Sequence, residues 1–542
     1  MGQTTGIEET AYINGKIYTA DDENPFAEAF TVRDGRFVSV GDNSIAHGVS
    51  NRIDLKGRTV LPGLIDSHCH FLAGVRLSTL NVLELPGGIL PRDLGKVIRK
   101  KAEEMGLSGD EPISAMGFDL SSGEFSAADI DREVDSRPVL VFSSDGHALL
   151  LNSEAMRVLN IDRDTVDPGE QSYFKRDNDG NPTGLVIEIP AIRICMEGMD
   201  EKKKDLRKIF FKLFSDYASL GYTTVFDASS VEEEDSEILK TLTEMDKEGK
   251  TSLRVVTSFI CHPEEVPSPE KAVGMMKKLK KDHSFDTVIF NTLKIIADGT
   301  VEEHTAFLHE PYFDQPGNSG SRMMPLSDMG KIVTLAANEG FNIHIHAIGD
   351  RAAGEVLDIL KSVRGCRGTR TIAHNQLYSE SEKSKILSDR DIFFQTTPHW
   401  IRSDAFTLNC LGEKRYALQF PFGTMAENGV RVAFGSDSCL EEITSDAFLG
   451  MYYAEIRGDR RYEGTCFPPL CESMGRMDCI KAYTINGAAL LGLDKETGSI
   501  EKGKSADFII TDRDVLNCRT EELKDTKVLE TFFRGRPSFT SF

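Results

Sequence analysis

Two histidines, His68 and His70, flank a single residue where the apolar run LPGLIDSHCH ends. Alternate residues of a β-strand face the same way, so both imidazoles would point to one side. Neutral imidazole is the commonest metal ligand among side chains, and two of them on one face make half of a metal site. These two residues alone fit a metal site and a pair of ordinary polar histidines equally well.

Three further apolar segments end in residues of the same kind. FNIHIHAIGD carries His344 and His346, RTIAH ends in His374, and RVAFGSD ends in Asp437. His344 and His346 share a face of their strand, so only one need be a ligand. We predict His346, because it is nearer the strand end. This placement of the histidines favours a metal site over scattered polar residues.

A lysine, Lys294, stands inside the apolar run TLKIIADG. Burying a lysine in a strand is costly unless the amine is paired or chemically altered. Carbamylation by carbon dioxide would convert the amine to an anion able to bridge two metal ions. The predicted metal ligands are therefore His68, His70, Lys294, His346, His374 and Asp437.

The elements that must position these residues are eight strand-like runs separated by helix-like stretches. The runs are TVLPGLID, YTTVFDA, SLRVVTSFI, DTVIFNTLKIIADG, GFNIHIHAIGD, RTIAHNQ, DIFFQTTPH and RVAFGSDS. Alternation of strands and helices indicates a parallel sheet, and eight units favour a closed (β/α)8 TIM-like barrel. A doubly wound sheet is the alternative, but no G-x-G-x-x-G follows the first strand.

Both ends of the chain consist of short alternating runs joined by turn signals. Asn14-Gly15, Asp34-Gly35 and Lys56-Gly57 predict hairpins near the start, and Arg534-Gly535 predicts one near the end. We therefore predict one discontinuous β-sandwich built from residues 1–60 and 495–542, with the barrel occupying residues 61–494.

The connection between the first and second barrel strands spans residues 72–221 and is too long for a structureless loop. It contains a strand-like run, PVLVFSS, and a polar hairpin, SYFKRDNDGNPTG. We interpret residues 80–205 or so as an inserted subdomain. Insertions after barrel strands commonly build the substrate pocket.

The composition is that of a globular protein, with 40% hydrophobic and 27% charged residues among 542. A formal net charge of −23 disfavours nucleic acid and anionic membrane surfaces as partners. No run approaches the roughly 20 apolar residues that span a bilayer. The N-terminal segment does not have the pattern of a secretory signal, and the 10 cysteines lack paired spacing. We expect a cytoplasmic protein with reduced thiols.

Several motifs resemble the amidohydrolase superfamily, and in particular its amidohydrolase-3 branch, which includes N-substituted formamide deformylases. They are VLPGLIDSHCH, LKIIADGT, HIHAIGDRA, IAHNQ, TTPHW, FGSDS, AYTINGA and GSIEKGKSADFII. The resemblance runs from about Ala11 to Asp512. It implies a β-sandwich and a metal-bearing (β/α)8 barrel. The segments IAH and TVEEHTAFL depart from the branch, so the particular substrate cannot be carried over.

The resemblance also implies roles for the predicted ligands. His68 and His70 would hold the more buried metal ion, and carboxylated Lys294 would bridge it to a second ion. His346 and His374 would hold that second ion. Zinc is the expected metal, in one or two ions, because imidazole and carboxylate ligands suit it and the predicted chemistry is not redox.

By the same resemblance, Asp437 would bind the first metal ion and contact the nucleophilic water. We expect it to accept the proton of the attacking water and to pass it to the leaving nitrogen. Asp437 is therefore both a predicted ligand and the predicted catalytic residue.

Four residues are predicted to bind substrate. His147 lies in the insertion, where it lines the pocket or is a structural histidine. His304 follows the strand that carries Lys294, where it contacts the substrate carbonyl or packs in a loop. His399 and Trp400 end the seventh strand, and Trp400, the single tryptophan, would stack on substrate.

The predicted function is metal-dependent hydrolysis of a carbon–nitrogen bond in a non-peptide amide, formamide or cyclic amide. One alternative is an esterase, lactonase or carbamate hydrolase that uses the same site. A second is an inactive barrel that serves as a binding protein. The expected partner is a small-molecule substrate, and a homodimer is expected only by analogy with other barrels.

Overall fold

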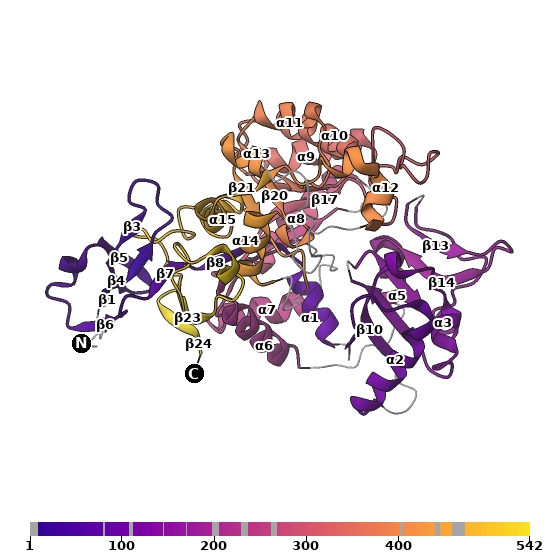
Figure 1. Cartoon of the computed structure of the whole chain (residues 1–542), viewed down its shortest axis with the longest axis horizontal. Helices are drawn as coiled ribbons and strands as arrows, with labels where there is room; N and C mark the ends of the chain where they lie inside the picture. Colours follow the sequence, from indigo (N-terminus) through magenta and orange to yellow (C-terminus); the bar gives the residue numbers. More distant parts are fainter. Residues whose placement is uncertain are drawn as a thin grey trace.

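A β-sandwich, a barrel and an inserted sheet lie in that order along the long axis of the molecule (Figure 1). The structure is a computed structural model. It describes residues 9–79, 82–107, 112–144, 146–169, 171–197, 205–228, 237–261, 268–401, 405–439, 445–457 and 472–541.

Eight parallel strands form the barrel, and each pairs with the next along the chain. They are β8 (Leu64–Cys69), β15 (Tyr222–Asp227), β16 (Arg254–Ile260), β17 (Val288–Ile296), β18 (Asn342–Ala347), β19 (Arg370–His374), β20 (Ile392–Thr396) and β21 (Val432–Phe434). Seven lie within the predicted apolar runs, and β8 begins in the first run and extends past it to Cys69, which confirms the barrel. Most of their residues are buried on both faces, as in other parallel sheets covered by helices.

The first and last strands meet through hydrogen bonds that bring the predicted ligands together. The Ser67 hydroxyl donates to the Phe434 carbonyl at 2.7 Å. Beyond the strands, the Asp437 amide donates to the His68 carbonyl at 2.8 Å, and the His70 amide donates to the Ser438 carbonyl at 2.9 Å. The ends of β8 and β21 are therefore held against each other at the barrel rim.

The helices of the barrel domain surround its strands, and most of them pack on the outer apolar faces of those strands. They are α1 (Phe71–Thr79), α6 (Leu206–Ser219), α7 (Glu237–Lys247), α8 (Pro269–His283), α9 (Leu326–Asn338), α10 (Asp350–Ser362), α11 (Glu380–Leu387), α12 (Ala405–Tyr416), α13 (Phe422–Glu427), α14 (Ala447–Ile456), α15 (Arg476–Ala482) and α16 (Ile485–Leu490), with a 3-10 turn, η3, at Pro398–Trp400. Helix α8 shows clear local signals, since the Ser268 side chain accepts from the Lys271 amide and Pro269 occupies the first turn.

Two sheets built from both ends of the chain form the sandwich. One has the order β5-β4-β1-β6 and the other β24-β23-β22-β7-β2-β3. The strands are β1 (Thr10–Ile13), β2 (Lys16–Tyr18), β3 (Phe26–Ala27), β4 (Ala29–Arg33), β5 (Arg36–Gly41), β6 (Asn51–Asp54), β7 (Thr59–Pro62), β22 (Phe508–Thr511), β23 (Val528–Phe533) and β24 (Arg536–Thr540), with η1 (Asn43–Ala46) and α17 (Thr520–Leu523) in the connections. Phe508 stacks on Phe532 at 4.3 Å and meets Phe30 at 4.8 Å, so aromatic rings from both ends share one core.

Two of the predicted N-terminal hairpins are wrong. Asp34-Gly35 and Arg534-Gly535 do join antiparallel pairs, β4–β5 and β23–β24. However, β1 pairs with β4 and β6, while β2 pairs with β3 and β7. The turns at Asn14-Gly15 and Lys56-Gly57 therefore carry the chain from one sheet to the other. A turn dipeptide fixes the local bend, but the partners of each strand are set by distant residues.

The insertion after the first barrel strand is a six-stranded mixed sheet with the order β13-β14-β12-β11-β10-β9. Its elements are β9 (Val82–Glu84), α2 (Pro91–Glu104), β10 (Ile113–Phe118), η2 (Leu120–Ser122), α3 (Ala127–Asp131), β11 (Val139–Ser143), β12 (Ala148–Leu151), α4 (Ser153–Val158), β13 (Tyr173–Arg176), β14 (Pro182–Ile187) and α5 (Ile189–Glu197). The predicted strand and hairpin are β11 and β13–β14, which confirms the inserted subdomain. Figure 1 shows it on the side of the barrel away from the sandwich.

No helix in the described part of the chain is long and apolar enough to span a membrane. The eight described cysteines are free thiols. The division of the chain at residues 60 and 495 stays a prediction.

Candidate metal centre

A cavity of about 280 Å³ opens between the barrel rim and the insertion. The barrel side is polar, whereas α5 and the inserted sheet contribute mainly apolar side chains such as Met116, Phe142, Ile192 and Met196. All six predicted metal ligands line this cavity, together with two predicted substrate residues: His68, His70, Lys294, His346, His374, Asp437, His147 and Trp400.

Asp437 lies at the centre of the cluster. Its Oδ1 is 2.9 Å from His70 Nε2 and 3.3 Å from His68 Nε2. Its Oδ2 is 3.4 Å from His374 Nδ1. One carboxylate therefore faces three imidazoles that come from the ends of β8 and β19. Such convergence of neutral nitrogen and anionic oxygen atoms is what a divalent metal ion requires.

The surroundings of the His374 ring give the clearest indication that this site binds a further group. Both of its ring nitrogens are buried and neither makes a hydrogen bond within the described part of the chain. Its ring lies 4.3 Å from that of His346 and stacks on Trp400 at 5.3 Å with an interplanar angle of 9°. Buried polar atoms are rarely left without a partner, so this donor set fits a metal ion.

The His68 ring is oriented from behind by two partners. His68 Nδ1 lies 2.9 Å from His344 Nε2 and 3.2 Å from Gln395 Oε1. These contacts turn Nε2 toward Asp437 and Lys294. Partners of this kind fix the ring orientation of histidine ligands in metal sites. The contact with His68 Nδ1 places His344 behind the predicted ligands. This position agrees with the prediction that His346, and not His344, binds the metal ion.

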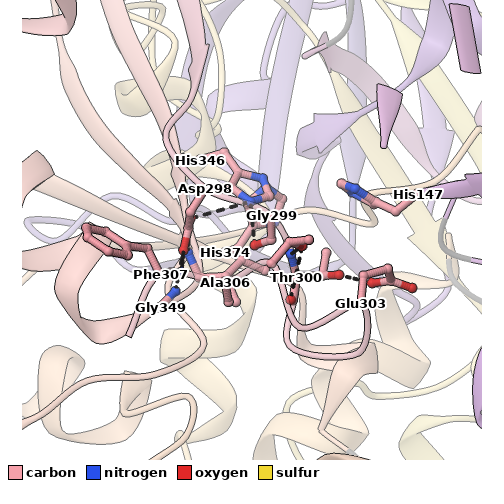
Figure 2. A network of polar contacts seen from close by, with 12 residues as sticks. His147, Asp298, Gly299, Thr300, Glu303, Ala306, Phe307, His346, Gly349 and His374 are labelled. Carbon is pink, nitrogen blue, oxygen red and sulfur yellow. Dashed lines mark hydrogen bonds and ion pairs between the residues drawn. The ribbon is translucent and has the colours of Figure 1, made fainter. Parts of the chain in front are cut away.

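The His346 ring is held through its Nε2 atom (Figure 2). Nε2 lies 3.5 Å from the Gly299 carbonyl and 3.9 Å from Asp298 Oδ1. Nδ1 is therefore the nitrogen that remains for a metal ion. Asp298 in turn accepts hydrogen bonds from the amides of Ile348, Gly349 and Phe307 at 2.8–3.0 Å.

Lys294 is buried, with 2% of its surface exposed, and its Nζ lies 3.1 Å from His68 Nε2. Burial lowers the pKa of this amine to about 7, against the opposing effect of Asp437 and Asp227. A substantial fraction of the amine is therefore uncharged near neutral pH, which is the form that reacts with carbon dioxide.

The charge states of the cluster suit metal binding. Burial lowers the pKa of His374 to about 3 and moves that of His68 and His346 well below the usual range. Burial alone would raise the pKa of Asp437, but His374, His70 and Lys294 outweigh it and lower that pKa well below its usual range. Neutral imidazoles and an ionised carboxylate are the states in which these groups bind metals.

Backbone strain is present at two of these positions. His374 and Asp437 have φ angles of 70° and 53°, a region that costs a non-glycine residue about 1 kcal/mol or more. Asp66 supports the backbone near Asp437, since it accepts hydrogen bonds from the Ser436 amide at 3.0 Å and from the Ser436 hydroxyl at 2.6 Å. The surrounding hydrogen bonds thus hold Asp437 in its position.

His147 reaches the cavity from the insertion and is fixed by a buried carboxylate. Its Nδ1 lies 2.7 Å from Glu188 Oε2, and Glu188 is 1% exposed. The Thr305 hydroxyl donates to Glu188 Oε1 at 3.0 Å. Figure 2 shows His147 across from His346, and their ring centroids are 6.2 Å apart. The insertion therefore contributes one oriented imidazole to the pocket.

The structure does not bring His304 and His399 to this cavity, within its described lining. The His399 Nε2 atom lies 2.9 Å from the carbonyl of Asp446, and its ring packs against Tyr453. His304 contacts Asp314 and Cys410 instead. Their predicted role in substrate binding receives no support from these positions.

Sequence reasoning missed four residues that support the centre: His344 as a partner of His68, Gln395, Asp298 and Glu188. Gln395 and Asp298 leave a signal, because each is a polar residue within or just after an apolar strand. Glu188 follows β14 with a φ of 67°, and no sequence signal indicates its contact with His147.

Comparison with known proteins relates most of the chain to one family. Residues 52–539 match the profile described as the amidohydrolase family. The exoenzymes regulatory protein AepA of Pectobacterium carotovorum subsp. carotovorum is 29% identical, covering 78% of this chain and 92% of that protein. The N-substituted formamide deformylase of Arthrobacter pascens is 25% identical, covering 98% of both. The putative amidohydrolase YtcJ of Bacillus subtilis is 26% identical, covering 96% and 98%.

Solved structures show the same fold. An uncharacterized metal-dependent hydrolase from Pyrococcus furiosus superposes with a TM-score of 0.70 at 24% identity, covering 94% of this chain and all of the other. One from Pyrococcus horikoshii gives 0.72 at 23% identity, covering 95% and 99%.

Proposed function

The chain belongs to the amidohydrolase family, and we propose that it is a metal-dependent hydrolase of a carbon–nitrogen bond in a non-peptide amide, formamide or cyclic amide. Family membership and the hydrolases among its relatives support hydrolysis as the reaction. The observation that carries the proposal is the convergence of three imidazoles on the Asp437 carboxylate. One of the three is His374, whose buried ring nitrogens make no hydrogen bond among the described residues.

Asp437 and the five other predicted ligands would hold one or two zinc ions, with Lys294 carboxylated where two ions bind. His68, His70 and Asp437 also form a three-ligand group whose donor atoms lie within 4.8 Å of one another. Bound zinc lowers the pKa of water from 15.7 towards about 7 and so supplies hydroxide at neutral pH.

In this proposal Asp437 is the residue that moves the proton. Its lowered pKa keeps it ionised, so it can accept a proton from the attacking water at the metal centre. The same carboxyl would then donate that proton to the leaving nitrogen, as a general base and afterwards a general acid.

The cavity walls would bind and orient the substrate. His147, held through Nδ1 by Glu188, presents its opposite ring edge toward the centre and would hydrogen-bond the substrate near the scissile bond. Trp400 supports His374 from one face and would limit the space beside it. The apolar side chains of the insertion would exclude water from the rest of the substrate.

The name of one relative favours the amide over the ester. The relative from Arthrobacter pascens is named as an N-substituted formamide deformylase, and its similarity covers nearly the whole of both chains. Ester, lactone or carbamate hydrolysis at the same centre remains the second candidate.

Metal analysis and a substrate panel test the proposal. The purified chain should contain divalent metal, and His70→Ala should lower that content, while the exposed His47→Ala in the sandwich should not. The metal-loaded protein should hydrolyse N-substituted formamides or cyclic amides faster than matched esters. A folded chain with no affinity for added zinc would contradict the proposal, and a preference for esters would move it to the second candidate.

A further inference from the structure

A second group of metal-ligating side chains lies outside the barrel-mouth cavity. His304 and Asp314 come from the connection between β17 and α9, residues 297–325, and Cys410 comes from α12. His304 Nε2 lies 3.0 Å and 3.2 Å from the two carboxylate oxygens of Asp314. The same nitrogen lies 3.5 Å from Cys410 Sγ.

The three side chains offer the three kinds of donor atom that zinc binds: an imidazole nitrogen, a carboxylate oxygen and a sulfur. These donor atoms all lie within 4.8 Å of one another. The single Nε2 atom of His304 is therefore close to both other side chains, as the ligands of one shared ion would be.

The distances match those between ligands of a tetrahedral zinc ion. Zinc lies about 2.0–2.1 Å from imidazole nitrogen and carboxylate oxygen and about 2.3 Å from thiolate sulfur. At tetrahedral angles these bonds separate nitrogen from sulfur by about 3.6 Å and nitrogen from oxygen by about 3.3 Å. The structure has 3.5 Å and 3.0–3.2 Å for the same pairs.

The three ligands are held in place by their surroundings. The ring of Tyr312 lies 4.8 Å from that of His304, and Asn318 donates to the His304 carbonyl at 3.1 Å. His304 has a φ of 58°, which is unusual for a residue other than glycine. The Phe313 amide donates to the Cys410 carbonyl at 2.8 Å. Contacts within the protein therefore already hold the connection and α12 together around the three side chains.

We propose that His304, Asp314 and Cys410 bind one zinc ion that is separate from the catalytic centre. Thiolate, imidazole and carboxylate together suit zinc better than magnesium or calcium, which prefer oxygen ligands. Cys410 is fully buried and the Asp314 side chain is 26% exposed, so the ion would sit at the edge of the protein. A water molecule would complete the four ligands.

The ion would clamp the connection of residues 297–325 onto α12. That connection also carries Asp298, whose side chain accepts hydrogen bonds from the loop after β18 (Figure 2). It carries Thr305 as well, which donates to Glu188. Clamping its far part would steady these contacts beside the catalytic centre without adding a ligand to it. The site does not depend on the proposed function.

Cobalt substitution tests the site, because the six residues proposed for the barrel-mouth centre include no cysteine. We expect the full-length protein loaded with Co²⁺ to show a sulfur-to-cobalt charge-transfer band in the near ultraviolet. Cys410→Ser and His304→Asn should abolish the band and lower bound zinc by one ion per chain. Cys366→Ser, at a thiol elsewhere in the fold, should leave the band and the zinc content unchanged.

Asp314→Asn guards against loss of folding, because this side chain is partly exposed and the substitution keeps its shape. It should weaken zinc binding at this site by at least about tenfold, since even residues that only support metal ligands have effects of that size. Absence of the band in folded, cobalt-loaded wild-type protein would overturn the proposal. So would a band that is unchanged in Cys410→Ser. Asp437→Asn should keep the band, which separates this result from a failure of the catalytic proposal.

Discussion

The two histidine clusters of this protein are built on different kinds of support. At the barrel mouth, the ligands stand on or next to the ends of neighbouring strands, and backbone hydrogen bonds join His68 to Asp437 and His70 to Ser438. In the second cluster, His304 and Asp314 stand on one long connection, and only Cys410 stands on a helix. A sheet holds its side chains in place with or without a metal ion, whereas a connection depends more on the ion itself.

The largest difference between the clusters should appear in catalysis. Asp437→Asn removes the proposed proton acceptor, and general acid–base catalysis typically contributes about 10²–10⁴-fold. We expect kcat to fall by about that factor with metal still bound, and Asp314→Asn to change kcat by less than about twofold. Steady-state kinetics with parallel metal analysis measures both. Full turnover in metal-loaded Asp437→Asn would show that this residue does not have the proposed role.

The second-largest difference between the two clusters should appear when the metal ions are removed. A ligand present at 100 times its Kd stabilises the state that binds it by about 2.7 kcal/mol, or about 100-fold in local opening. Chelation should therefore raise hydrogen exchange in residues 297–325 and at the start of α12 by up to about that factor. Exchange in β8, β18 and β19 should change far less. Equal increases in hydrogen exchange in both regions would show that ligands on strands and ligands on the connection depend on the metal ion to the same degree.

The smallest expected effect concerns Lys294 and pH. With its pKa lowered to about 7, the metal-free amine is mostly charged at pH 6 and mostly neutral at pH 8, a change of about tenfold in the reactive form. Carbamate formed from ¹³C-bicarbonate should therefore rise with pH through 7, as a carbonyl signal in the NMR spectrum. Lys294→Met should lack this signal. A signal that does not change between pH 6 and 8 would argue against a neutral buried amine.

The barrel could be predicted because parallel strands buried on both faces appear as uninterrupted apolar runs. Four of the runs lead into a histidine or aspartate that can bind a metal ion, and the carboxyl ends of parallel strands lie on the same rim. His304 and His399 also follow barrel strands, yet they do not reach the cavity. A side chain beyond the end of a strand points in a direction that its loop sets. The periodicity of the strand does not predict that direction.

The supporting contacts were not predictable for a related reason. Glu188 is 41 residues from His147, and Cys410 is 106 residues from His304. Neither pair has a spacing that a local pattern could reveal. The N-terminal turns show the same limit, since Asn14-Gly15 is a turn whose flanking strands belong to different sheets.

The sequence by itself determined the barrel, the insertion and the six residues brought to one rim, because strand periodicity and the shared direction of parallel strands are local properties. Only the tertiary structure decided which ring nitrogen each histidine presents, that Glu188 orients His147, and that His304 meets Asp314 and Cys410. These features depend on the approach of distant segments, and that approach is set by the packing of the whole molecule.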